Sequence, residues 1–240
     1  MKVLSIGNSF SVDAHQWLHK LAEINGIDMQ LYNLYIGGCS LERHWQEYEN
    51  DTKEYELLVN GEKQYNISLR DGLNLDEFDV VTFQQASHFS GVPQTYFPFL
   101  ANLLELVKAA QPKAKLYFHE TWAYEVDSDH GGFAAYNNDQ KEMFRRIGGA
   151  ARLATDFIGG EIIPSGTVIQ KLRETVPEFD YKNGGMSLNR DGFHLSLDYG
   201  RFAAAATWLY TLTGIKPQVD RFEDFDTELL NKIIDTVVSI

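Results

Sequence analysis

Short apolar runs alternate with longer amphipathic stretches along the whole chain. Five such runs end in glycine or in polar residues, which is typical of buried strands. They cover residues 3–6, 29–35, 80–83, 115–118 and 161–163. We expect these five segments to form the core of one sheet.

Helical periodicity separates most of these runs. Apolar residues recur at three- and four-residue spacing over residues 13–25, 97–110, 134–154, 199–212 and 227–238. Repeated strand–helix alternation predicts parallel strands joined by right-handed crossovers, with helices on both faces of the sheet. The pattern therefore predicts an α/β fold with a doubly wound parallel five-stranded sheet.

One insertion interrupts the alternation at about residues 42–78. Within it, residues 55–59 and 62–67 flank Asn60-Gly61, a pair that strongly favours a type I′ turn. We expect a small hairpin that lies over the sheet edge or near the site. Because no internal repeat, low-complexity segment or linker occurs, we predict a single domain over residues 1–240.

Composition narrows the possible partners. The chain has 240 residues, of which 44% are hydrophobic and 23% charged, as in ordinary globular proteins. Its 34 acidic and 21 basic residues give a net charge of -13, which repels phosphate backbones and anionic lipid surfaces. We therefore expect neither a nucleic-acid nor a membrane partner, whereas a neutral small-molecule or glycan ester meets no such penalty. No feature of the sequence specifies an oligomeric state.

Cysteine usage and the first residues bear on the compartment. Cys39 is the single cysteine, so no internal disulfide and no cysteine-based metal cluster are possible. The apolar run at residues 3–6 is too short for a signal peptide. As it stands, the sequence predicts a cytoplasmic protein, or a periplasmic or secreted one if a native leader has been removed.

Polar loops follow the strands, and their residues meet at one edge of a parallel sheet. Ser9 follows the first strand in Gly7-Asn8-Ser9-Phe10-Ser11, where a serine is more often a helix cap. In Asp191-Gly192-Phe193-His194, Asp191 can accept from Nδ1–H of His194 and leave Nε2 free to take a hydroxyl proton. Alone, this spacing is more often a surface turn.

Other polar residues suggest little chemistry of their own. His119, Glu120, His130 and Asp139 lack the spacing of metal-binding motifs, so we expect no metal and no cofactor. The segment that begins at His130 contains two glycines and is more typical of a plain turn than of an oxyanion loop.

The ordered combination of these signals resembles the SGNH (GDSL-like) hydrolase superfamily. Residues 7–11 resemble its first block, Gly38 its second, and residues 191–194 its fifth. The wider stretches 36–45, 121–124 and 163–167 resemble a bacterial branch known only as a domain of unknown function. The resemblance implies a flavodoxin-like three-layer α/β/α fold and ester hydrolysis, often deacetylation of carbohydrates.

The resemblance also implies roles for particular residues. Ser9 would be the nucleophile, His194 its base and Asp191 the acid that orients the imidazole. The oxyanion hole would use the backbone N–H groups of Ser9 and Gly38 and a side-chain amide. Where the superfamily usually has Asn, this chain has Gln84 and Gln85, and we expect Gln84 to serve, with Gln85 as the alternative.

Four aromatic or imidazole side chains are candidates for stacking on a sugar, although such residues are more often core: Trp45, His88, Trp122 and Tyr124. The sequence thus predicts a serine esterase that removes O-acetyl or other short acyl groups from a carbohydrate through an acyl-enzyme. The alternatives are a lipase- or thioesterase-like acyl hydrolase and a non-catalytic glycan-binding protein with the same fold. A nucleotide binder is disfavoured because no glycine-rich run with lysine occurs.

Overall fold

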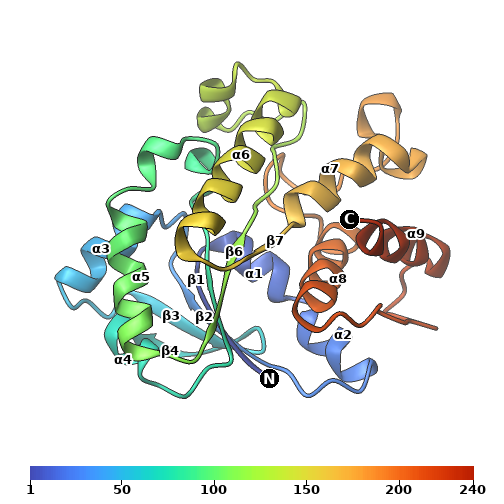
Figure 1. Cartoon of the computed structure of the whole chain (residues 1–240). Coiled ribbons are helices and arrows are strands. Elements are labelled where there is room, and N and C mark those ends of the chain that lie inside the picture. Colours follow the sequence, from blue (N-terminus) through green and yellow to red (C-terminus); the bar gives the residue numbers. More distant parts are fainter.

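A central sheet of seven strands organises the molecule in the computed structural model, which describes residues 1–240. The strands lie in the order β4-β3-β2-β1-β5-β6-β7 (Figure 1). Their bounds are β1 Lys2–Gly7, β2 Gln30–Tyr35, β3 Tyr55–Val59, β4 Glu62–Ile67, β5 Val80–Phe83, β6 Lys115–His119 and β7 Glu161–Ile163.

Five of these strands are parallel neighbours, in the order β2-β1-β5-β6-β7. In the central strand, Val3 pairs with Leu31 on one side and with Val80 on the other. Among the parallel strands, β2 lies on one side of β1, whereas β5, β6 and β7 follow in that order on the other side. The predicted doubly wound sheet is confirmed, and its topological switch point lies between β1 and β5, where ligands bind in such sheets.

The predicted hairpin is also present, as β3 and β4. Both turn residues adopt positive φ, with 51° at Asn60 and 87° at Gly61, as a type I′ turn requires. β3 pairs antiparallel with β2, so the hairpin extends the edge of the parallel sheet. The insertion therefore continues the sheet and does not lie over it.

Helices cover both faces of the sheet (Figure 1). α1, α2, α7, α8 and α9 pack on one face, and α3, α4, α5 and α6 pack on the other. Their bounds are α1 Ser9–His15, α2 Leu18–Ile24, α3 Leu41–Glu49, α4 Leu69–Leu73, α5 Phe99–Ala110, α6 Gln140–Ile158, α7 Ser165–Thr175, α8 Tyr199–Thr213 and α9 Thr227–Val238. Short 3-10 turns cover Ser87–Phe89, Pro93–Thr95, Gly131–Tyr136, Pro177–Phe179 and Tyr181–Asn183. None of the helices combines the length and apolar character needed to cross a bilayer.

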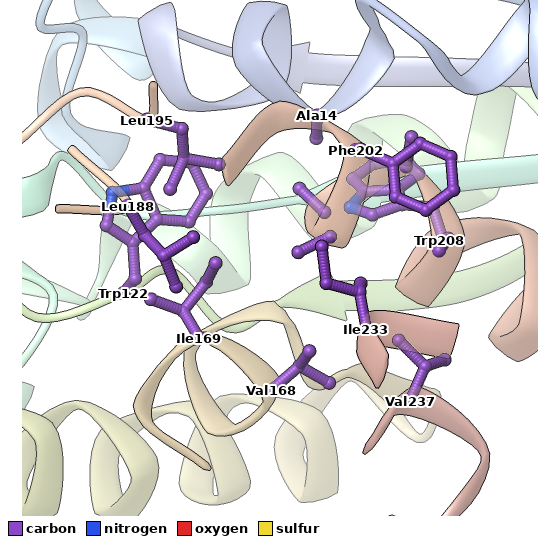
Figure 2. Close-up of a cluster of buried hydrophobic side chains, with 14 of the residues drawn as sticks. Ala14, Trp122, Val168, Ile169, Leu188, Leu195, Phe202, Trp208, Ile233 and Val237 are labelled. Atoms are coloured by element: carbon purple, nitrogen blue, oxygen red, sulfur yellow. The ribbon is translucent and has the colours of Figure 1, made fainter. Parts of the chain in front are cut away.

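Two hydrophobic cores result from the alternation of side chains along the strands. In β5, Val80 points into the core beneath α8, whereas Val81 points into the core beneath α5. The first core is centred on α8, whose Phe202 and Trp208 are fully buried among residues of α1, α7 and α9 (Figure 2). This helix therefore joins the C-terminal part of the chain to the N-terminal one.

Some helix boundaries differ from the sequence prediction. The helix expected over residues 13–25 is two helices, and the first already begins at Ser9. The helix expected from residue 134 begins at Gln140, because Asp139 caps it by accepting from two backbone N–H groups. Helices α3, α4 and α7 were not predicted.

Candidate active site

Ser9 lies at the carboxyl edge of β1 as the first residue of α1. The preceding Asn8 caps this helix, since its Oδ1 accepts from the Phe10 N–H at 3.0 Å. The Asn8 amide group donates in turn to the carbonyl of Cys39 at 3.0 Å. One side chain thus ties the turn that carries Ser9 to the loop that follows β2.

A chain of buried polar side chains supports Asn8 from behind. Gln84 Nε2 donates to Asn8 Oδ1 at 2.6 Å, and Gln84 Oε1 lies 3.0 Å from His119 Nδ1. His119 Nε2 lies 3.0 Å from the hydroxyl of Ser165. The chain therefore links the ends of β1, β5, β6 and β7. We refer to Asn8, Gln84, His119 and Ser165 as the amide–imidazole chain.

The direction of each hydrogen bond in the amide–imidazole chain is set by the Phe10 N–H, which donates to Asn8 Oδ1 at one end of the chain. Asn8 Oδ1 must accept from a backbone N–H, so Gln84 presents its NH2 to Asn8 and its oxygen to His119. His119 then carries its proton on Nδ1 and accepts from Ser165 on Nε2. Burial, with a smaller contribution from His15, lowers the pKa of the His119 imidazole to about 3, so the ring is neutral at physiological pH.

Neither glutamine lies where the sequence analysis expected an oxyanion donor. Gln84 is 1% exposed and directs its amide at Asn8. Gln85 is equally buried; its amide donates to the carbonyl and hydroxyl oxygens of Thr95, and its oxygen accepts from the Leu41 N–H. Both side chains hold loops together behind the pocket instead of lining it.

The imidazole of His194 bridges Ser9 and Asp191. Its Nε2 lies 2.8 Å from Ser9 Oγ, and its Nδ1 lies 2.7 Å from Asp191 Oδ2. The other oxygen of Asp191 accepts from the backbone N–H groups of Phe193 at 3.2 Å and of His194 at 2.7 Å. The spacing D-x-x-H thus folds into a tight turn in which the carboxylate binds both the backbone and the ring.

Two opposing effects act on the Asp191 carboxyl. Partial burial disfavours its ionised form, but the hydrogen bonds from the His194 ring and from the backbone of His194 and Phe193 outweigh this effect. The pKa of Asp191 is therefore lowered from its ordinary value. At neutral pH the residue is an anion that fixes the Nδ1–H tautomer of His194 and leaves Nε2 facing Ser9.

A buried carboxylate of α1 holds the turn that carries Asp191 and His194. Asp13 is fully buried and pairs with Arg190 at 3.0 Å and with Arg201 at 2.8 Å. It also accepts from the Leu195 N–H at 2.9 Å. Arg190 precedes Asp191 and Leu195 follows His194, so Asp13 binds both ends of the turn. We refer to Asp13, Arg190 and Arg201 as the ionic clamp.

Asp13 was not predicted from the sequence. The only local signal is its place on the same helical face as the buried Phe10 and Ala14, where a charged residue is unusual. Asp13 lies one helical turn beyond Ser9, so the clamp couples Ser9 to His194 through a short rigid element.

Further contacts fix the tip of the same turn. Trp122 Nε1 donates to the Phe193 carbonyl at 2.7 Å, and the Glu125 N–H donates to the Gly192 carbonyl at 2.7 Å. Leu195 is fully buried in the core beside Trp122 and Leu188 (Figure 2). The turn is therefore anchored by the hydrophobic core as well as by hydrogen bonds.

Ser9 and His194 open onto a pocket of about 350 Å³. Ten residues line it, of which only two are hydrophobic: Ser9, Tyr35, Gly37, Gly38, Ser87, His88, His130, Gly132, Phe193 and His194. The backbone N–H groups of Ser9 and Gly38 have no acceptor within the protein. Gly38 adopts a φ of 62°, a left-handed conformation that favours glycine. Two unpaired donors thus accompany the serine at one end of the pocket.

Among the four residues expected to bind a sugar, only His88 lines this pocket. Trp122 is fully buried and stacks on Phe10, with ring centroids 4.1 Å apart. Tyr124 is also fully buried, and its hydroxyl lies 2.8 Å from that of Ser87. Trp45 stacks on Tyr48 along α3, outside the lining. The expectation that Trp122 and Tyr124 face a sugar is therefore wrong, because both rings are part of the core.

Comparison with known proteins places the chain in a family. The model of DUF4886, a domain of unknown function, matches residues 2–230. The chain belongs to the DUF4886 family. It is 35% identical to a DUF4886 protein of known structure from Bacteroides uniformis, with a TM-score of 0.92 over 100% of this chain and 93% of that one. No curated protein matches the chain.

More distant structures share the fold of this DUF4886 protein. A protein from Slackia heliotrinireducens assigned to the SGNH hydrolases is 23% identical, with a TM-score of 0.60 over 88% of this chain and 98% of that one. An acetyl xylan esterase is 15% identical, with a TM-score of 0.56 over 87% and 98% of the two chains. The DUF4886 chain therefore has the SGNH-hydrolase fold, as the resemblance in its sequence predicted.

Proposed function

We propose that this protein is a serine esterase that removes short acyl groups, such as acetyl, from a carbohydrate. The observation that carries the proposal is the continuous chain of hydrogen bonds from Ser9 Oγ through His194 to Asp191, at 2.8 and 2.7 Å. This arrangement is the one that a hydroxyl nucleophile, its general base and an orienting carboxylate require.

The reaction begins when Ser9 Oγ attacks the ester carbonyl carbon and passes its proton to His194 Nε2. The electron pair of the C=O bond moves to the oxygen, which accepts hydrogen bonds from the free N–H groups of Ser9 and Gly38. Asp191 stabilises the imidazolium that forms. Loss of a single oxyanion donor costs roughly 3–4 kcal/mol of transition-state stabilisation.

Collapse of the tetrahedral intermediate restores the carbonyl and breaks the bond to the alcohol. The leaving oxygen takes the proton from His194 Nε2, and the acyl group remains on Ser9. A water molecule then gives a proton to His194 and attacks the acyl carbon, so that the acid leaves and the Ser9 hydroxyl is restored.

The size and polarity of the pocket support a short acyl group. A volume of about 350 Å³ with two hydrophobic lining residues offers little apolar surface to a long chain. The SGNH-hydrolase fold is shared with an acetyl xylan esterase and equally with lipases, so the preference for a short acyl group rests on the pocket and not on the fold. A lipase- or thioesterase-like acyl hydrolase would need an apolar groove that this pocket lacks.

The test is hydrolysis of p-nitrophenyl acetate by the wild type and by Ser9→Ala, together with labelling by a fluorophosphonate probe. We expect Ser9→Ala to lose at least about 10⁴-fold in kcat and all labelling. Ser239→Ala, a change at the exposed end of α9, serves as the control and keeps both. Binding of a glycan by the wild type with neither turnover of any ester nor labelling would favour a glycan-binding protein, and equal rates for wild type and Ser9→Ala would sink the nucleophile assignment.

A further inference from the structure

Two histidines that the proposed mechanism does not use line the pocket, His88 and His130. The ring of His130 is fixed by its own turn, because its Nδ1 accepts from the Gly132 N–H at 3.0 Å. A backbone N–H can only donate, so a neutral His130 carries its proton on Nε2. Burial and the charge that His194 acquires lower the pKa of His130, whereas Asp129 and Asp191 act in the opposite direction with smaller effect. The neutral tautomer with Nε2–H is thus favoured.

The Nε2–H of His130 has no acceptor within the protein. It is not among the buried polar groups that lack a partner, so it is accessible from the pocket. The ring is held by Tyr124 and Phe193, each with its centroid 4.8 Å away. Glycine is required at position 132 because a Cβ there would lie 2.4 Å from the Cβ of His88. His130 therefore presents a donor of fixed direction on a pocket wall that a side chain at residue 132 would disrupt.

The position of this donor relates it to one part of the substrate. His194 Nε2 must protonate the leaving oxygen, so the alcohol portion of the ester has to lie beside the His194 ring. The ring of Phe193 lies 4.2 Å from that of His194 and 4.8 Å from that of His130. His130 thus packs against the same Phe193 ring as His194 and lines the same pocket, into which the leaving oxygen must be released.

We propose that His130 Nε2–H donates a hydrogen bond to an oxygen of the alcohol portion, beyond the oxygen that carries the acyl group. The ligand class is an alcohol with further hydroxyl groups, such as a sugar ring, because only such an alcohol offers a second oxygen near the reacting one. The inference rests on the proposed esterase function and adds that the enzyme recognises the alcohol portion of its substrate.

The experiment compares two acetate esters that differ in the alcohol. Methyl xyloside monoacetate has free hydroxyl groups beside the ester, whereas p-nitrophenyl acetate has none. His130→Phe keeps an aromatic ring and removes both the Nε2–H donor and the Nδ1 acceptor of the Gly132 N–H. We expect its kcat/KM on the sugar ester to fall about tenfold, the equivalent of one hydrogen bond to the substrate. Its kcat/KM on p-nitrophenyl acetate and its labelling by a fluorophosphonate stay within about twofold of the wild type.

Two further variants complete the test. His130→Gln keeps an NH2 donor and should recover part of the loss on the sugar ester. A merely structural role would lower the rates on both esters together, so the rate on p-nitrophenyl acetate separates the two cases. His19→Phe, a change on α2 outside the pocket lining, should leave both rates unaltered.

The inference is overturned if His130→Phe lowers both rates equally, if it changes neither, or if the wild type hydrolyses p-nitrophenyl acetate but not the sugar ester. A wild type that hydrolyses no ester and takes no fluorophosphonate label would instead overturn the proposed function itself.

Discussion

The two halves of the candidate active site are held in place by opposite kinds of chemistry. On the side of Ser9, the amide–imidazole chain runs from Asn8 to Ser165 through neutral groups only. On the side of His194, the ionic clamp places the fully buried carboxylate of Asp13 between two arginines. Both arrangements fix a loop to the sheet or to α1, but they depend on different properties of the protein.

A neutral chain depends on where each proton lies, whereas an ionic clamp depends on the presence of each charge. The two arginines of the clamp keep their charge at any pH at which a protein is folded. The imidazole of His119 can gain a proton in acid, and it then no longer accepts from Ser165. The two halves should therefore respond to different perturbations.

The largest expected effect comes from Asp191→Asn. The amide cannot fix the Nδ1–H tautomer of His194, so Nε2 is no longer a ready acceptor for the Ser9 proton, and kcat should fall by about 10⁴-fold. Steady-state hydrolysis of p-nitrophenyl acetate measures it. Asp129→Asn makes the same charge change on an exposed residue and should leave kcat nearly intact. A loss below tenfold for Asp191→Asn would mean that His194 is oriented by something else.

The next effect in size is expected from Asp13→Asn, which breaks the ionic clamp. Loss of one partner of a buried ion pair should lower the free energy of unfolding by about 3 kcal/mol. Displacement of the turn should also reduce kcat on p-nitrophenyl acetate by roughly ten- to a hundredfold with little change in KM. Urea unfolding and steady-state kinetics measure the two quantities.

Controls separate positioning by Asp13 from simple stability. Asp235→Asn removes an exposed carboxylate paired with Lys216 and should alter neither quantity by much. Asp13→Glu, which keeps the charge, should restore part of kcat. If stability falls for Asp13→Asn while kcat stays at the wild-type value, the clamp holds the fold but does not position His194.

The smallest effect is a pH dependence of stability that originates in buried neutral histidines, one of which is His119 of the amide–imidazole chain. Burial lowers the pKa of His119, His15 and His44 to about 3 each, with minor contributions from neighbouring charges at His119 and His44. In the unfolded chain each ring has a pKa near 6.5, so between about pH 6.5 and 3 the unfolded state binds protons that the native state does not. Stability should therefore be complete above pH 6.5 and fall toward pH 3.

The contribution of one ring to this slope is at most about 1.4 kcal/mol per pH unit. His119→Gln should reduce the slope of unfolding free energy against pH by about this amount, as measured by urea unfolding at pH 6, 5 and 4. An unchanged slope would show that His119 is already protonated in the native state, contrary to its place in the amide–imidazole chain.

Most of the sheet could be predicted from the sequence because its strands are short apolar runs with clear ends. The hairpin was predictable from Asn60-Gly61, whose turn type allows few alternatives. Helix α7 was not predictable in this way, because its first turn contains Ser165 and Gly166 and Pro164 precedes them. Glycine is needed at position 166 since a Cβ would lie 2.0 Å from the Thr121 carbonyl oxygen, a contact that only the folded chain creates.

The candidate site divides in the same way. Asp191 and His194 are three residues apart, so their mutual contact follows from local geometry. Ser9 was predicted from the ordered combination of loop signals that resembles the SGNH hydrolases, because its place after the first strand alone favours a helix cap. Asp13 could not be identified, because its partners Arg190 and Arg201 lie 177 and 188 residues away along the chain. Gln84 was expected to face the oxyanion but donates to Asn8 instead. The direction of a buried amide depends on partners that are distant in the sequence, so this contact could not be predicted.

The separation between Ser9 and His194 has a consequence for biosynthesis. The two residues lie 185 positions apart, and the turn that carries His194 is completed only by packing of α8 against α1. A chain that emerges from the ribosome N-terminus first carries Ser9 as an ordinary alcohol until nearly all of the protein has been made. If the protein has the proposed esterase function, incomplete chains are inert toward esters, and the appearance of activity during synthesis reports that the last helices have docked.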